Sequence, residues 1–406
     1  MKLKLFSRAG LNFFGVSLPA TVEDRVLLLL SIKEKGKLID FNHIAEKVIR
    51  DEKGKITAQQ LRQVLDKLVS EGLVRAEREG YYAIAERGYQ LIVERLEEVG
   101  DYLNLSYRMV FKAKQYYPQV AEILTYYLKD RPTSVVKVFS DEEDPIHRIK
   151  PLFVRYARYK PKPVNIFINS SQELLRYVDD HAIDFIPYVH KQSSNMPDWL
   201  IIDMDAGPKF WLHPRGFDLI KVIANSVAEV LEENDVTPYL KFSGSRGIQI
   251  WASFRKEDLP KVDDYFALYR KLAILIRDLT EQKLQSLSSS TLDEFYKVVT
   301  KGKPITTSQV AKKEEREDQV LLDWSSMKPA GDVRAPFSLH HKTGLISCPI
   351  MRKEILTFTP DQAEPVKVAE KAAKLFEAFK LEPSSPSKLL SQLKEYKPPP
   401  RQLTLF

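Results

Sequence analysis

The stretch that decides the fold runs from residue 198 to residue 251, opening with DWLIIDMDAGP (198–208) and closing with YLKFSGSRGIQIW (239–251). In its first part an apolar run leads into Asp203-Met204-Asp205, and a Gly-Pro pair then turns the chain. Because alternate side chains of a strand share a face, the two carboxylates are expected to point the same way. Like charges at that spacing repel unless a cation lies between them, and a hard divalent ion with oxygen ligands is the natural occupant.

The second part of the stretch complements these carboxylates. A helical pattern of apolar residues at 219–231 leads to a strand at 239–242, then to Ser243-Gly244-Ser245-Arg246-Gly247 and a further strand at 248–251. A Gly/Ser loop between strands exposes backbone N–H groups that can hold phosphate, and Arg246 adds a bidentate donor. Metal-binding carboxylates that face an anion-binding loop indicate nucleotidyl or phosphoryl transfer.

At these residues the chain resembles the archaeo-eukaryotic primase superfamily, in particular the polymerase domain of bacterial end-joining ligases, with features of the archaeal primase small subunit. That family has a DxD motif, a Ser-Gly-x-x-Gly-x-His motif and a later Asp on a strand. They match Asp203-Met204-Asp205, residues 243–249 with Gln249 in place of His, and Asp323 in QVLLDW (319–324). The resemblance covers roughly residues 130–360, and it implies that Mg²⁺ or Mn²⁺ is held by the three aspartates, which would be catalytic.

A later segment, RAPFSLHHKTGL (334–345), resembles the part of archaeal primases that closes the nucleotide pocket. The resemblance implies a set of nucleotide-binding residues: Ser243, Ser245, Arg246, Gly247, Gln249, Arg334, His340 and Lys342. Gln249 carries no positive charge, so we expect a slower enzyme rather than an inactive one. Adjacent residues on a strand point to opposite faces, so His340 and His341 are not expected to share a metal.

Composition limits the number of domains and the classes of protein to which the chain can belong. A chain of 406 residues predicts two or three domains, and 62 basic against 55 acidic residues permit nucleic-acid binding without proving it. The single cysteine, Cys348, excludes a disulfide framework and fits a reducing compartment. No apolar run near the start is long enough to span a bilayer, and charges interrupt what could be a signal peptide. We therefore expect a cytoplasmic, nucleoid-associated protein without a membrane partner.

The N-terminal part is predicted to be an extension at 1–21 followed by a winged helix-turn-helix at 22–107. Helices are expected at 23–35 and 41–51, and a third begins after Thr57, with Gln60 as its capping-box partner. Two short strands around Glu79-Gly80 would form the wing. The exposed face of the third helix is nearly neutral, so DNA binding and docking of a protein partner carry equal weight.

The remaining segments are predicted to be a helical connector at 108–130, a primase-polymerase-like domain at 131–360 and a C-terminal helix at 361–381. Basic residues at 148–162 with interleaved aromatic residues suit template contact, although a solvated charged face is equally compatible. A Pro/Ser/Lys-rich linker, in which a short helix at 389–393 is allowed, is expected from 382 and ends in RQLTLF (401–406). This tail resembles the peptide that binds the sliding clamp PCNA, which assigns clamp contacts to Gln402, Leu405 and Phe406.

Together these patterns predict an α+β fold, in which an N-terminal all-α/winged-helix domain precedes a primase-polymerase catalytic module with mixed sheets. The expected function is DNA-dependent nucleotidyl transfer, as a primase or a repair and gap-filling polymerase, by two-metal chemistry on nucleoside triphosphates while tethered to the clamp. The alternative is a weakly active or inactive accessory protein that binds primer-template or nucleotide and docks partners through its winged helix. A transcription regulator led by the winged helix receives little support from its nearly neutral third helix.

Overall fold

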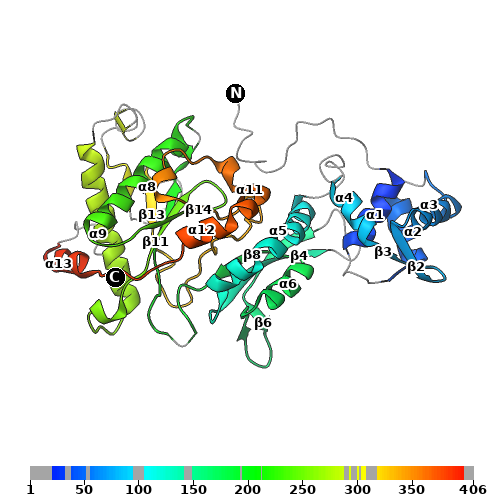
Figure 1. The fold of residues 1–406 in the computed structure, drawn as a ribbon, viewed down its shortest axis with the longest axis horizontal. Coiled ribbons are helices and arrows are strands. Elements are labelled where there is room, and N and C mark those ends of the chain that lie inside the picture. Colours follow the sequence, from blue (N-terminus) through cyan, green and yellow to red (C-terminus); the bar gives the residue numbers. More distant parts are fainter. Residues whose placement is uncertain are drawn as a thin grey trace.

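The computed structural model describes residues 21–32, 38–51, 55–94, 105–140, 149–192, 194–211, 213–287, 292–293, 300, 303–307 and 318–396 (Figure 1). The proposed clamp contacts Gln402, Leu405 and Phe406, and nearly all of the predicted extension at 1–21, lie outside the described residues. The N-terminal elements gather at one end of the molecule, and a large sheet with its helices forms the other end.

The N-terminal module contains the helices and the hairpin that the sequence predicts. Its third helix starts at Thr57, whose hydroxyl accepts from the Gln60 N–H while the Gln60 side chain accepts from the Thr57 N–H, a complete capping box. A three-stranded antiparallel sheet in the order β1-β3-β2 packs beside the helices. The winged-helix assignment itself stays a prediction. The elements are α1 (Val22–Ile32), β1 (Ile39–Asp40), α2 (Phe41–Asp51), α3 (Ala58–Ser70), β2 (Val74–Arg78), β3 (Tyr81–Ile84) and α4 (Glu86–Glu94).

Helix α5 (Leu105–Leu128) connects this module to the rest of the chain. It packs on β8 (Ala182–Pro187) and α6 (Ser171–Asp179), and also on the C-terminal helices α11 (Pro365–Glu370) and α12 (Ala372–Ala378). Its tyrosines Tyr116, Tyr117 and Tyr127 are buried, whereas Tyr126 is 49% exposed. The Tyr117 hydroxyl donates to the carbonyl of Ile183 at 2.5 Å and accepts from the N–H of Leu339, so α5 anchors two distant segments.

A three-stranded antiparallel sheet in the order β5-β4-β8 follows, with β4 (Thr133–Ser140) in the centre and β5 (Ile149–Val154) at one edge. A two-stranded ribbon, β6 (Tyr156–Arg158) and β7 (Val164–Asn165), extends from it (Figure 1). After the ribbon, residues 166–168 do not continue as a strand. Ile166 exchanges only isolated backbone hydrogen bonds with Thr133 and Arg155, and Ile166 and Ile168 are buried by packing instead.

The large sheet has six strands in the order β12-β13-β9-β11-β10-β14, and only the β12–β13 pair is parallel. Helices α8 (Gly216–Glu233) and α9 (Tyr265–Ser286) pack on each other and against β9 and β11. The strands are β9 (Leu200–Ala206), β10 (Tyr239–Phe242), β11 (Ile248–Ala252), β12 (Thr306–Thr307), β13 (Val320–Asp323) and β14 (Pro349–Ile350). The remaining short helices are α7 (Pro208–Trp211), η1 (Lys256–Asp258), η4 (Arg352–Glu354) and η5 (Pro360–Ala363).

The C-terminal part differs from the prediction at two points. The helix expected within 361–381 is two short helices, α11 and α12, separated at Lys371, where the backbone leaves helical geometry at φ −109°. The linker predicted from 382 is ordered through Tyr396. Ser384 exchanges backbone hydrogen bonds with Ser253 and Arg255, and α13 (Ser387–Glu395) buries Leu389 completely, in packing against α9. None of the described helices is long and apolar enough to cross a membrane.

Candidate functional site

One row of paired residues crosses four neighbouring strands of the large sheet. Asp323 on β13 lies opposite Asp203 on β9, which lies opposite Gln249 on β11, which in turn lies opposite Lys241 on β10. Directly opposed residues of antiparallel strands present their side chains on the same face. Asp205, two residues beyond Asp203, shares that face. The sheet therefore brings together the three aspartates that the sequence assigned to one site.

The ionised form of the Asp203 carboxyl is disfavoured at this position. Burial, and then the neighbouring carboxylate of Asp323, raise the pKa of Asp203 to about 6, whereas Lys241 and a hydrogen bond from Gln249 act in the opposite direction. The Asp323 carboxylate accepts from the N–H of Ser325 at 2.7 Å and from its hydroxyl at 3.0 Å. These local donors hold Asp323 beside Asp203 without neutralising either charge.

The donor set suits a hard divalent cation only in part. Among the described residues, no group of three His, Cys, Asp or Glu side chains is spaced to hold a metal ion. The Asp205 Oδ1 accepts from Arg246 Nη2 at 3.1 Å, so this guanidinium competes with a cation for the Asp205 carboxylate. The raised pKa of Asp203 marks a repulsion that a cation would relieve, so the Asp203–Asp323 pair fits one.

Lys241 is a member of the row that the sequence analysis missed. It is fully buried, and its ammonium donates to the Ser347 hydroxyl at 2.5 Å. Burial and Arg334 lower the pKa of Lys241, while Asp203 and Asp184 favour its charged form. The sequence signal for this residue was a single lysine between Leu240 and Phe242 in an otherwise apolar strand. Pairing with Gln249 places its side chain on the same face of the sheet.

The Ser243–Gly247 loop lies beside the end of the aspartate strand. The Ser243 hydroxyl accepts from the N–H groups of Ser245 at 3.3 Å and Gly247 at 3.2 Å, which closes the loop on itself. Gly244 has φ +84°, and a Cβ there would lie 2.9 Å from the Cβ of His340. Only glycine fits this turn, because both the backbone conformation and the close packing exclude a side chain.

Gln249, which replaces the histidine of the related motif, is turned toward Asp203. Its side-chain oxygen accepts from the indole N–H of Trp251 at 3.3 Å. With the oxygen engaged in this way, the amide nitrogen is the group that donates to Asp203. The structure thus places Gln249 against a carboxylate of the row, whereas the sequence analysis assigned it to phosphate.

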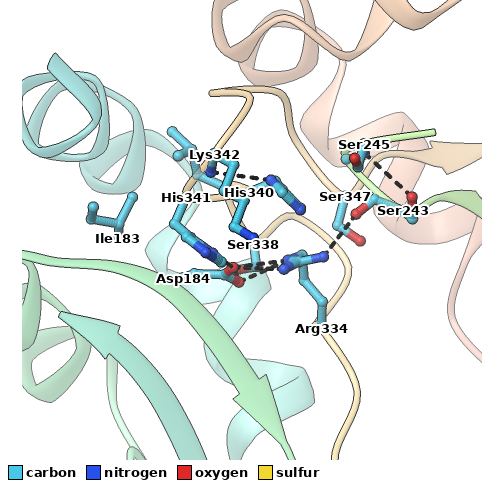
Figure 2. Close-up of polar contacts among 12 residues, drawn as sticks. Ile183, Asp184, Ser243, Ser245, Arg334, Ser338, His340, His341, Lys342 and Ser347 are labelled. Atoms are coloured by element: carbon cyan, nitrogen blue, oxygen red, sulfur yellow. Dashed lines mark hydrogen bonds and ion pairs between the residues drawn. The ribbon is translucent and has the colours of Figure 1, made fainter. Parts of the chain in front are cut away.

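A second charged cluster, also missed, surrounds Asp184 on β8 (Figure 2). Its carboxylate is fully buried and accepts from Arg334 at 2.8–3.0 Å, from the Ser338 hydroxyl at 3.1 Å, and lies 3.0 Å from Nδ1 of His341. Burial would raise the pKa of Asp184, but Arg334 and the hydrogen bonds hold it well below its usual range. The signal in the sequence was a single acidic residue within the apolar strand AIDFIP (182–187).

The two histidines do not point to opposite faces as predicted. Their rings stack 5.2 Å apart and 8° from parallel, because residues 340–345 form a tight turn rather than a strand. His340 Nδ1 accepts from the N–H groups of Lys342 at 3.2 Å and Thr343 at 3.3 Å, which leaves the proton on Nε2. Burial and Arg334 lower the pKa of His340, so the ring is neutral and its Nε2–H is a donor. The Lys342 side chain is exposed next to it.

Comparison with known proteins identifies the family. The model of the LigD primase-polymerase domain matches residues 112–379, which is well over half of the chain and includes the complete row. Among solved structures, the polymerase domain from Mycobacterium tuberculosis ligase D in complex with DNA is similar at 16% identity and a TM-score of 0.48, over 70% of this chain and 92% of that chain. No curated protein sequence matches. The chain therefore belongs to the LigD primase-polymerase domain family.

Proposed function

We propose that this chain is a DNA-dependent nucleotidyltransferase, an end-joining or gap-filling polymerase or a primase, whose reaction takes place at the Asp203–Asp323 pair. The observation that carries the proposal is the register of the large sheet, which sets Asp323 opposite Asp203 beside a Gly/Ser loop in a member of this family. Two carboxylates side by side next to an anion-binding loop form the arrangement that phosphoryl transfer requires.

In this proposal Asp203, Asp205 and Asp323 would hold Mg²⁺ or Mn²⁺, which would supply charge neutralisation and activation of the primer hydroxyl when bound. The residues of the chain do the binding and orienting. The Ser243–Gly247 loop, whose Ser245 and Gly247 N–H groups bond the Ser243 hydroxyl, offers the Gly244 N–H to the triphosphate. Arg246 moves from Asp205 to phosphate, while Lys342 adds positive charge and His340 a neutral Nε2–H donor.

The surface around β4 to β7 supports contact with a DNA template. Phe139, Phe153 and Tyr159 are 42%, 47% and 60% exposed, which is unusual for large aromatic side chains. Lys137 lies over the Phe139 ring at 5.0 Å, and Arg155 over the Phe153 ring at 5.3 Å. Exposed rings with cations beside them suit base stacking and phosphate contact at once.

A second candidate function, primer-template or nucleotide binding with little or no catalysis, draws support from two features. Asp205 is paired with Arg246, and Gln249 occupies the histidine position and faces Asp203. The first feature reduces the anionic charge that is available to a cation, and the second removes a side chain that could carry positive charge beside a phosphate. An accessory protein with this site would bind its ligands and extend nothing.

An extension assay separates the two functions. With a primed template, labelled nucleotides and Mn²⁺ or Mg²⁺, the wild-type chain is expected to extend the primer, and Asp203→Ala to abolish extension while DNA binding is retained. Asp361→Ala is the matched control, because the Asp361 side chain is 60% exposed and forms an ion pair with Lys367 outside the row. Binding without extension at high nucleotide concentration would favour the accessory role, and full activity of Asp203→Ala would refute the assignment of the site.

The N-terminal module carries its own proposal, docking of a protein partner. The Arg62 guanidinium of α3 lies over the Phe41 ring at 3.9 Å, and Arg78 in the hairpin lies over Tyr81 at 3.7 Å. Unlike the exposed rings of Phe139 and Phe153, the Phe41 ring is buried and offers no stacking surface to a base, which favours protein docking over duplex binding. Titration of the module with duplex DNA at low salt tests this, because tight binding would reverse the assignment.

The C-terminal tail remains a proposed clamp-binding peptide on the grounds of its sequence alone, RQLTLF (401–406). Its aromatic and aliphatic residues would enter a pocket on the clamp while Gln402 hydrogen-bonds at the pocket edge. Phe406→Ala is expected to abolish binding to an immobilised clamp, with Lys397→Ala unchanged as the control. Equal binding of both variants would exclude the tail as the tether.

A further inference from the structure

The guanidinium of Arg334 is shared between two partners on different sheets. Nε donates to both carboxylate oxygens of Asp184, at 2.9 and 3.0 Å, and Nη2 donates to Oδ2 at 2.8 Å. Nη1 points the other way and donates to the carbonyl of Ser243 at 3.1 Å. Figure 2 shows Arg334 between Asp184 and the Ser243 loop. All three nitrogens are therefore engaged within the protein.

These contacts tie together three parts of the fold. Asp184 belongs to β8 of the three-stranded sheet, Ser243 begins the loop between β10 and β11 of the large sheet, and Arg334 lies in the segment between β13 and β14. The Arg334 side chain is 15% exposed, and that of Asp184 is fully buried. A buried carboxylate without its cation is costly, so the pair is held firmly in this geometry.

A second contact from the same segment holds the next carbonyl of the loop. The Thr343 hydroxyl donates to the carbonyl of Gly244, and Gly344 continues the turn by donating its N–H to the His340 carbonyl at 2.9 Å. In a trans peptide the N–H points opposite to the C=O. Two carbonyls drawn toward residues 334–343 therefore turn the N–H groups of Gly244 and Ser245 away from that segment.

We propose that Arg334 and Thr343 form an orienting strap, which sets the direction of the Gly244 and Ser245 peptide groups. The Ser245 N–H then closes the loop on the Ser243 hydroxyl at 3.3 Å, and the Gly244 N–H faces outward to bind an anion. Arg334 is then a positioning residue that acts through the Ser243 carbonyl, and it does not contact the triphosphate as the sequence analysis expected. This inference rests on the proposed function only for the identity of the anion. The orientation of the loop is a property of the chain without substrate.

The strap and a direct phosphate contact make opposite predictions for Asp184→Asn. If Arg334 were a ligand of the triphosphate, removal of the Asp184 charge would release its guanidinium and leave nucleotide affinity unchanged or tighter. If Arg334 instead orients the loop, it must be held in place by Asp184. Asp184→Asn is then expected to weaken nucleotide binding as Arg334→Gln does. The double variant is then no worse than either single variant, because each removes the same device.

The first test is amide hydrogen exchange of the substrate-free chain, read in peptides that cover 243–249. Arg334→Gln, Asp184→Asn and the milder Thr343→Val are all expected to speed exchange there, the last by about fivefold, as for loss of one hydrogen bond. Arg352→Gln is the matched control, since Arg352 makes the same forked contact with Glu232 at 2.6 and 3.0 Å away from this loop. Unchanged exchange at 243–249 in Thr343→Val would overturn the proposal even if the two charge variants fail to fold.

The second test is a nucleotide titration of the primer-extension reaction. We expect Thr343→Val and Arg334→Lys to raise the nucleotide KM while kcat changes little, because the loop is misoriented and the aspartates are not. A wild-type KM in Arg334→Lys would contradict the proposal. It would show that a positive charge at this position is sufficient, whereas the strap requires the forked guanidinium. If the wild-type chain extends nothing, the proposed function fails, while the exchange comparison still decides on the strap.

Discussion

Replacement of Asp203 by asparagine is predicted to stabilise the metal-free protein. The carboxylate of Asp203 is held next to that of Asp323 and is partly removed from water, so its charge opposes folding. Asparagine has the same shape and hydrogen-bonding reach without the charge. The site would thus gain stability while losing its function, which is the reverse of what a core substitution does.

The magnitude follows from the pKa of Asp203, which rises from 3.8 to about 6. Each unit corresponds to about 1.4 kcal/mol, so the charged form costs at most ~3 kcal/mol, and partial solvent screening brings the expectation to about 1–3 kcal/mol. Because the folded-state pKa is raised, the native state binds more protons between the two values, and stability falls as pH rises through that window. The gain from Asp203→Asn should be absent near pH 4 and complete above pH 7.

Thermal or urea unfolding of both proteins across this pH range, in the presence of a chelator, provides the measurement. Asp205→Asn is the matched control on the same strand, and its loss of the Arg246 ion pair predicts no gain. Added Mn²⁺ should stabilise the wild-type chain more than Asp203→Asn, because a bound cation removes the same repulsion. A destabilised Asp203→Asn at pH 7.5, or a difference that does not depend on pH, would refute the reasoning.

Three further predictions concern other parts of the chain. Lys241→Met should destabilise the wild-type protein by several kcal/mol but cost less in an Asp203→Asn background, because the lysine then no longer offsets a buried charge. Urea unfolding of the wild type, the two single variants and the double variant measures this coupling. Gly244→Ala should lower stability by about 1–3 kcal/mol and abolish nucleotide binding, given its φ of +84° and the close His340 Cβ, as unfolding and a binding titration would show. Leu389→Ala should cost about 2–4 kcal/mol in urea unfolding, since a fully buried leucine leaves a cavity, whereas a linker residue would cost nothing.

Local patterns predicted much of the fold, because they report interactions between residues close in the sequence. The capping box at Thr57 and Gln60 and the alternation in the DxD strand each depend on neighbours within a few positions. From 382 composition predicted a linker with a short helix, and it did not show that this segment packs on the rest of the fold. Proline and serine composition describes the local chain, but Ser384 is held by Ser253, on a strand end more than a hundred residues earlier.

Sequence reasoning found those residues of the candidate site that belong to a motif. It missed the contacts that form only when distant parts of the chain pack together. The aspartates came from motif spacing, and the register of β13 against β9 brings them together. Asp184 and Arg334 are separated by 150 residues, so no spacing rule connects them. Lys241 joins the row only once the strand order β9-β11-β10 is known, and the sequence alone does not fix that order.

The position of β9 within the sheet has a consequence for the growing chain on the ribosome. One neighbour of β9 in the sheet, β11, follows it closely in the sequence, but its other neighbour, β13, is made more than a hundred residues later. Throughout that interval one side of β9 is an open edge, of the kind that recruits strands from other molecules. Asp203 and Asp205 place two like charges on this strand, and charged side chains on an edge strand oppose pairing with strands of other molecules.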